Sequence, residues 1–180
     1  YAVVGHSMGG AVALALAAAR PRQVTRVVAV STMGAPGAPL SAELDAIWAA
    51  PAGPLGARDM LSRLVHDQAL VTESAVDARA AAMRSGAAAY ASLFPPPRAR
   101  WADELALPAQ TLAGVRAPVL LVHGAEDRVT PIGTAALPLL EHLADVRLYV
   151  LGRCGHVPAI EHPHEFRQLL SCFLREDRGY

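Results

Sequence analysis

The chain opens with Tyr1-Ala-Val-Val-Gly-His-Ser-Met-Gly-Gly10, in which Ser7 stands among glycines between an apolar run and an alanine-rich segment. Residues 2–4 are typical of a buried parallel strand, and residues 9–20 are rich in helix formers. The pattern predicts a strand-to-helix turn so tight that only glycine fits on either side of the serine. Such a turn would lift the Ser7 hydroxyl clear of the sheet, although a serine at a helix start is also a common N-cap.

Outward from this turn, strands and helices alternate at both ends of the chain. The β-branched run at residues 24–30 completes a βαβ unit, for which a right-handed crossover is expected. Further strands are predicted at residues 118–123 and 146–151, and further helices at residues 132–143 and 163–175. This order predicts an α/β fold with a parallel sheet.

The middle of the chain predicts helices and no convincing strand. A glycine- and proline-rich loop at residues 33–39 is followed by helical patches at residues 41–49, 57–64, 73–84, 87–93 and 98–105. We therefore expect a core segment with the serine turn (1–38), a helical lid (39–114) and a second core segment (115–180).

The composition excludes several classes of protein. The 180 residues carry 16 basic and 16 acidic side chains, so nothing indicates binding to nucleic acid or an anionic membrane. No signal peptide and no apolar run of about 18 residues is found. Two cysteines are too few for a secreted disulfide framework, which favours the cytoplasm. Because the chain begins inside an expected strand, we expect it to be the C-terminal part of a longer protein.

Acyl chemistry at Ser7 needs a base and an acid, because a serine hydroxyl by itself is a weak nucleophile. Asp127 and His156 each follow a predicted strand, and active residues of α/β sheets gather at the carboxyl ends of strands. In this arrangement Ser7 attacks a carbonyl, His156 transfers the proton and Asp127 orients the imidazole. The backbone N–H of Met8 would supply one oxyanion donor.

Other residues compete for two of these roles. Glu126 is the alternative acid, and Asp127 could be a simple turn residue. His162 and His164 are the alternative bases, although both stand near a predicted helix start. The tight turn before His156 favours that residue.

The remaining reactive side chains carry no predicted chemistry. Cys154 is interpreted as a buried packing residue rather than a nucleophile, and His66 and His123 as ordinary histidines. The seven histidines show no metal-ligand spacing, so we predict no metal.

Taken together, the serine turn, HGAEDRVTP (123–131) and GRCGH (152–156) followed by EHP resemble the α/β-hydrolase family. Three stretches of the middle segment are more specific, namely LDAIW (44–48), LVHDQALVTESAVDAR (64–79) and FPPPRARW (94–101). They resemble the lid of meta-cleavage product hydrolases of the 2-hydroxymuconic semialdehyde hydrolase type. The resemblance covers essentially the whole chain and implies a partial α/β-hydrolase fold, with the N-terminal strands and the second oxyanion donor missing.

The resemblance implies a cofactor-free hydrolase that cleaves a carbon–carbon bond in a 2-hydroxy-6-oxohexa-2,4-dienoate-type product of aromatic degradation. In this family the dienol first becomes a ketone, and serine and histidine then help the serine oxygen or water to cleave the acyl side. Arg79 matches a lid arginine that binds the carboxylate and enol end, although it could also be a solvated arginine on a helix face. His6 and Val157 replace the family's usual asparagine and tryptophan, so both are expected in the substrate pocket.

Two alternatives remain open. A carboxylesterase or enol-lactonase of the same fold would use the same triad without needing Arg79. A catalytically inactive fragment is the other alternative. If the protein is an enzyme, the expected partner is a small-molecule substrate, and neither nucleic acid nor a membrane is expected as a partner. A homo-oligomer is plausible.

Overall fold

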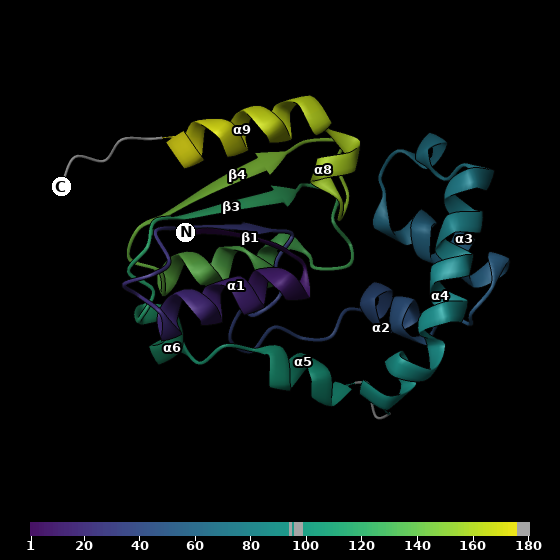
Figure 1. The fold of residues 1–180 in the computed structure, drawn as a ribbon, viewed down its shortest axis with the longest axis horizontal. Coiled ribbons are helices and arrows are strands. Elements are labelled where there is room, and N and C mark those ends of the chain that lie inside the picture. The colour runs from purple at the N-terminus through teal and green to yellow at the C-terminus, as the bar shows by residue number, and fades with distance from the viewer. Residues whose placement is uncertain (94, 96–98, 176–180) are drawn as a thin grey trace.

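The structure, a computed structural model, describes residues 1–93, 95 and 99–175. Within them, four parallel strands form one sheet in the order β1 (Ala2–His6), β2 (Arg26–Val30), β3 (Val119–Gly124) and β4 (Val146–Leu151) (Figure 1). Val28 of β2 lies beside Leu120 of β3. The two strands are therefore neighbours in the sheet, although the whole helical middle segment separates them in the chain. The predicted α/β fold with a parallel sheet is confirmed.

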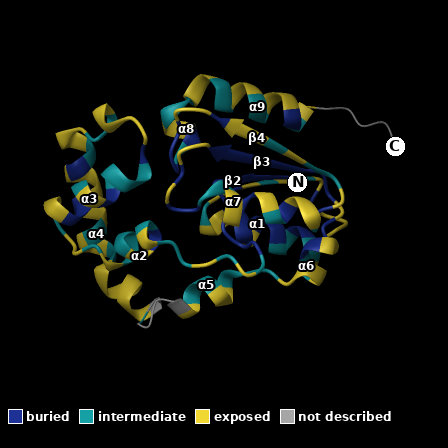
Figure 2. Cartoon of the chain, turned by 180° about the vertical axis from the view of Figure 1, so that it is seen from behind, coloured by how far each residue is buried: buried dark blue, intermediate teal, exposed yellow. Residues whose placement is uncertain are grey.

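Helices cover both faces of the sheet (Figures 1 and 2). One face carries α1 (Met8–Ala19), α6 (Ala109–Ala113) and the 3-10 helix η2 (Leu137–Glu141), and the other carries α9 (Pro163–Arg175). Because successive side chains of a strand point to opposite faces, Val27 packs with Leu14 of α1 while Val28 belongs to the cluster of Phe173 of α9. Valine and leucine on both faces explain the continuous apolar runs of the buried strands.

A second group of helices lies beyond the carboxyl ends of the strands, toward which the arrows of Figure 1 point. It consists of α2 (Ala42–Ala49), α3 (Pro54–Leu64), the 3-10 helix η1 (Gln68–Leu70) and α4 (Glu73–Leu93). Ala57 of α3 packs on Val76 and Ala80 of α4. From here α5 (Ala99–Leu105) leads back to the sheet.

Hydrogen bonds join these helices to the loops that follow β3 and β4. Ser41 Oγ caps α2 by accepting from Leu44 N, and donates to the carbonyl oxygen of Val129 at 2.6 Å. The backbone N–H of His156 donates to the carbonyl oxygen of Leu64, at the end of α3, at 2.7 Å. The helical segment is therefore attached to both loops that carry the predicted acid and base.

Two predicted helices have different bounds. Residues 73–84 and 87–93 form the single helix α4, because one glycine, Gly86, costs only about 1 kcal/mol in a helix and alanines follow it. The predicted helix at residues 132–143 is broken into α7 (Ile132–Ala135) and η2. Pro138 explains the break, because proline lacks an N–H and disfavours a helical residue before it.

Three short elements were missed, each of five residues or fewer: η1, α6 and α8 (Pro158–Glu161). Phe94, Pro96, Pro97 and Arg98, which belong to the FPPPRARW stretch, lie outside the described residues. None of the described helices is long and apolar enough to cross a bilayer.

Candidate active site

Ser7 occupies the turn between β1 and α1 with φ 56° and ψ −121°. Residues other than glycine adopt such a positive φ rarely and at an energetic cost. Two bonds to the chain around the end of β2 hold the turn: Ser7 N donates to Val30 O at 2.8 Å, and Ser7 O accepts from Met33 N at 3.1 Å. Ser7 is thereby fixed at the carboxyl edge of the sheet.

Only one of the two glycines flanking the turn is required by close approach. A Cβ on Gly5 would lie 2.0 Å from the carbonyl oxygen of Gly9, so no side chain fits there. A Cβ on Gly9 would meet nothing within 4 Å among the described residues, so the prediction that only glycine fits on both sides is wrong for Gly9. The second crowded glycine is Gly10, where a Cβ would lie 2.2 Å from Thr32 Oγ1, because this position faces the loop after β2.

Asp127 lies in the loop after β3, and its side chain is fully buried. Oδ1 accepts from the backbone N–H groups of Val129 and Thr130, both at 2.9 Å. Oδ2 accepts from the hydroxyl of Thr130 at 2.8 Å and from Nδ1 of His156 at 2.9 Å. Burial alone would raise the pKa of Asp127, but the hydrogen bond and charge of His156, with the N–H of Thr130, hold it below its usual value.

His123 supports this acid loop from the end of β3. Its Nε2 donates to the carbonyl oxygen of Thr130 at 2.7 Å and lies 3.3 Å from Asp127 Oδ2. Burial keeps the pKa of His123 below its usual value, which favours the neutral ring. His123, which sequence reasoning left without a role, therefore positions the carboxylate.

His156 lies in the loop after β4 and is buried. Because the Asp127 carboxylate only accepts, Nδ1 must carry the proton, and Nε2 of the neutral ring is left as the basic nitrogen. The Thr130 hydroxyl lies 3.2 Å from the same Nδ1. Within the described part of the chain, no hydrogen bond joins the His156 ring to the Ser7 hydroxyl.

His6 links the serine turn to the histidine loop. Its Nε2 donates to the backbone carbonyl oxygen of His156 at 2.7 Å, and the two ring centroids lie 4.8 Å apart. The structure therefore brings Asp127 and His156 into direct contact, and it places Ser7 next to His6, which contacts His156.

A small cavity opens at the serine turn. It is lined by His6, Ser7, Met8, Gly9, Met33, Leu44, Trp48 and Tyr90. Met8 is the first residue of α1, and N–H groups in the first turn of a helix have no partner within the helix. The Met8 N–H is therefore a donor at the N-terminus of a helix beside the serine.

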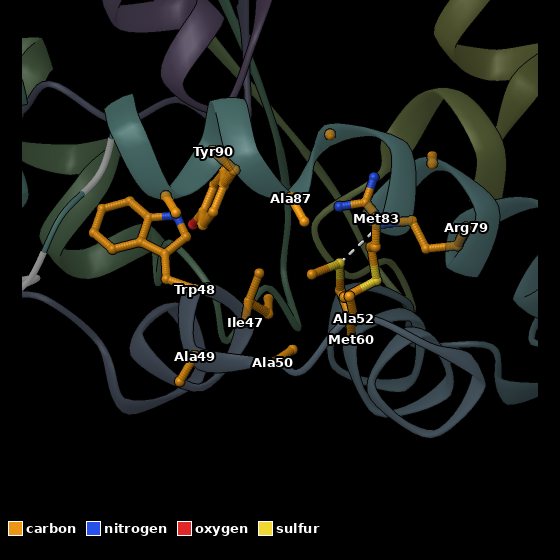
Figure 3. Close-up of a pocket in the computed structure, with 13 residues that line it drawn as sticks. Ile47, Trp48, Ala49, Ala50, Ala52, Met60, Arg79, Met83, Ala87 and Tyr90 are labelled. Carbon is orange, nitrogen blue, oxygen red and sulfur yellow. Dashed lines mark hydrogen bonds between the residues drawn. The ribbon is translucent and has the colours of Figure 1, made fainter.

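A larger cavity of about 560 Å³ lies between α2, α3 and α4 (Figure 3). Trp48 and Tyr90 line both cavities, so the two spaces adjoin. Among the described residues that line the larger one, Arg79 is the one with a charge, and its neighbours are apolar side chains such as Met60 and Met83. Arg79 Nε points at the sulfur of Met60 at 3.0 Å, a weak contact.

The competing residues have other contacts. Glu126 Oε2 accepts from the backbone N–H of Cys154 at 2.9 Å, and this bond lowers the pKa of Glu126. His162 Nε2 donates to the carbonyl oxygen of Arg153 at 3.1 Å. Cys154 is fully buried, and burial, with Glu161 nearby, raises the pKa of its thiol to about 12.

Val157, which was also predicted as a substrate-binding residue, stands at the N-cap position of α8 and lines neither cavity. Nowhere in the described ranges do three or more histidine, cysteine, aspartate or glutamate side chains gather in a way that could hold a metal ion.

Comparison with known proteins agrees with this geometry. The sequence model of the alpha/beta hydrolase family matches residues 1–169. The chain belongs to the alpha/beta hydrolase family. Family membership accounts for the sharp serine turn and for the acid and histidine loops at one edge of a parallel sheet.

Three relatives of this alpha/beta hydrolase are informative. A 2-hydroxymuconate semialdehyde hydrolase of Pseudomonas putida is 35% identical over 97% of this chain and 62% of the relative. A pimeloyl-[acyl-carrier protein] methyl ester esterase of Aromatoleum aromaticum is 33% identical over 96% of this chain and 73% of the relative. Among solved structures, the meta-cleavage product hydrolase CumD of Pseudomonas fluorescens superimposes with a TM-score of 0.89 at 32% identity, covering 95% of this chain and 63% of that one. The chain thus spans about 62% of the length of the first curated relatives.

Sequence reasoning missed two residues of the candidate site besides His123. Thr130 contacts both members of the Asp127–His156 pair, and Glu161 binds the histidine loop. Both residues stand inside the sequence motifs, Thr130 in HGAEDRVTP and Glu161 in EHP. A motif shows that these residue types are present, but which atoms they contact depends on the tertiary structure.

Proposed function

We propose that this chain carries the catalytic centre of a serine-dependent hydrolase that cleaves a carbon–carbon bond in 2-hydroxy-6-oxohexa-2,4-dienoate-type products of aromatic ring cleavage. The observation that carries the proposal is the buried Asp127–His156 pair, which lies against the neighbour of Ser7 in the serine turn. The substrate class is supported by the relatives named 2-hydroxymuconate semialdehyde hydrolase and meta-cleavage product hydrolase.

In the proposed mechanism, the dienol first becomes a ketone, which leaves an acyl carbon open to attack. Ser7 Oγ, or a water in its place, attacks this carbon while Nε2 of His156 accepts the proton. The Met8 N–H stabilises the oxyanion, and the carbon–carbon bond breaks as the dienolate leaves and takes up the proton held by His156. Where Ser7 is the nucleophile, a water that gives its proton to His156 then hydrolyses the acyl ester, which releases the acid and restores Ser7. Asp127 keeps Nδ1 protonated and stabilises the imidazolium that forms.

The larger cavity suits a substrate with one anionic end. Apolar walls would hold the carbon chain, while the guanidinium of Arg79 offers a planar, permanently charged fork for a carboxylate. His6 lines the cavity at Ser7, which supports a place in the substrate pocket. Residues 39–114 would then act as a lid above the serine, whereas the proposed place of Val157 in the pocket has no support from the two cavities, which it does not line.

The decisive experiment measures the loss of the yellow dienoate colour with the protein expressed from its own gene. We expect turnover by the wild type and a loss of roughly 10⁴-fold or more in kcat for Ser7→Ala. Ser92→Ala, at an exposed position of α4, is the control and should keep wild-type activity. Wild-type-like turnover by Ser7→Ala, or no cleavage of any dienoate by a folded protein, would contradict the proposal.

An esterase is the second candidate, and the relative named as a methyl ester esterase is the observation that favours it. The two functions differ in the bond that breaks. A protein that hydrolyses p-nitrophenyl or methyl esters and leaves dienoates intact is an esterase. Running the same assays on the isolated 180-residue chain, with its cooperative unfolding as a check, tests the remaining alternative of an inactive fragment.

A further inference from the structure

Glu161, the last residue of α8, has an unusual number of backbone partners. Oε1 accepts from the N–H of Gly155 at 2.7 Å. Oε2 accepts from the N–H groups of His66 and Asp67 at 2.6 and 3.2 Å. One carboxylate therefore binds the loop that carries His156 and, at the same time, the segment that links α3 to η1.

The two segments that Glu161 joins are in direct contact. The N–H of His156 donates to the carbonyl oxygen of Leu64 at 2.7 Å. A Cβ on Gly155 would lie 2.7 Å from the same oxygen and 2.9 Å from His66 N, so there is no room for a side chain between them. The backbone of the His156 loop therefore packs directly on the backbone of residues 64–66, and the Glu161 carboxylate lies beside this contact and binds both segments.

The chemistry of the contact requires a carboxylate. Its two oxygens accept on both sides and donate on neither, which matches three N–H groups that can only donate. Hydrogen bonds to an ionised acceptor are about twice as strong as neutral ones. A glutamine would present one acceptor and one NH₂ group, and the NH₂ group would face a donor on one of the two sides.

We propose that Glu161 is a positioning residue that couples the helical segment to the base: it holds residues 64–67 and the His156 loop as one unit. A movement of α3 then moves the backbone of His156 and changes where its Nε2 lies relative to Ser7. This inference rests on the proposed catalytic role of His156. It goes beyond that role because it assigns the position of the His156 imidazole to Glu161, a residue that contacts neither the substrate nor the ring.

The test compares Glu161→Gln with the matched control Glu165→Gln. Glu165 lies four residues further on, in α9, and accepts one bond from the Tyr149 hydroxyl at 2.7 Å, away from the site. For each variant, kcat and KM are measured on the dienoate and on a p-nitrophenyl ester. Amide hydrogen exchange is measured at Gly155, His66 and Asp67. Gly155→Ala forces the same two segments apart while the carboxylate of residue 161 is kept, although the added Cβ would also lie 3.1 Å from Glu161 Oε1.

We expect Glu161→Gln to lower kcat by about 10- to 100-fold with little change in KM, because small displacements of a catalytic group have effects of this size. Amide exchange should become faster on both sides of the contact. Gly155→Ala should give the same pair of effects, and Glu165→Gln neither.

Faster exchange with unchanged kcat would overturn the coupling and leave Glu161 a purely structural residue. Unchanged exchange would overturn the contact itself. If Glu161→Gln fails to fold, Gly155→Ala alone must show both effects, or the proposal is wrong. Failure of the proposed function looks different, because either Ser7→Ala would keep its activity or the folded wild type would cleave no dienoate, whatever the amides show.

Discussion

His6 Nε2 donates to the carbonyl oxygen of His156 at 2.7 Å, although 150 positions separate the two residues in the chain. A carbonyl only accepts, so the proton of the neutral His6 ring lies on Nε2. Partial burial and the neighbouring His156 ring keep the pKa of His6 below its usual value, which favours this neutral form. The residue before Ser7 thus fixes the backbone of the proposed base.

Replacing His6 should therefore weaken catalysis through His156. We expect His6→Leu to lower kcat on a p-nitrophenyl ester by roughly tenfold, since a neutral hydrogen bond is worth about 1 kcal/mol. His6→Gln keeps a donor at a similar distance from the backbone and should recover most of the rate. Equal kcat values for the leucine variant and the wild type, both fully folded, would show that the bond does not position the loop.

Asp127 should make stability depend on acid pH. Its pKa is lowered in the folded state, so its contribution is present above the unfolded value of about 3.8 and is lost as pH falls through the lower, folded value. Asp127→Asn should cost about 1–3 kcal/mol of unfolding free energy at pH 7, and this difference should shrink below pH 3.8. Denaturant unfolding at pH 7 and pH 3 measures it.

The control for this prediction is Asp77→Asn, because Asp77 is exposed on α4. Its unfolding free energy should stay within about 0.5 kcal/mol of the wild type at both pH values. A cost of Asp127→Asn that stays constant down to pH 3 would mean that the carboxylate is not stabilised by the His156 loop.

Arg79 should separate the two candidate reactions. Arg79→Met removes the charge from the apolar cavity, so we expect kcat/KM on a dienoate to fall about 10- to 100-fold, as for the loss of a charged hydrogen bond. Hydrolysis of a neutral p-nitrophenyl ester should change little. Arg84→Met is the control, because Arg84 is exposed on the same helix, as Arg79 is, but does not line the cavity. An equal loss on both substrates would place Arg79 in the structure of the lid rather than in substrate binding.

The two glycines beside the serine should behave differently. Gly5→Ala places a Cβ 2.0 Å from a backbone oxygen and should cost at least 1–3 kcal/mol of stability, roughly the cost of overpacking a core. Gly9→Ala meets open space and lies in α1, where alanine is favoured by about 1 kcal/mol. Thermal unfolding of the two variants checks the order, and a stable Gly5→Ala protein would contradict the tight turn.

Local sequence determined the elements of this protein where one local preference was strong. The apolar runs predicted the four strands of the described sheet, and the amphipathic run at residues 163–175 predicted α9 with its bounds. The residue types at the serine turn and in the two loop motifs also sufficed to name Ser7, Asp127 and His156 as candidates. At Gly86 and Pro138 the predicted helix ends were wrong, because a single glycine costs a helix only about 1 kcal/mol and does not end it, whereas a proline breaks it.

Only the tertiary structure decided which groups touch. The bond from His6 to the His156 carbonyl, the contact of Thr130 with the Asp127–His156 pair and the three N–H groups around Glu161 all join segments that are remote in the chain or depend on loop shape. The crowding at Gly10 and the open space at Gly9 likewise depend on where the loop after β2 lies. A sequence pattern records which side chains are available, whereas hydrogen bonds depend on distances that arise only when the sheet brings its loops to one edge.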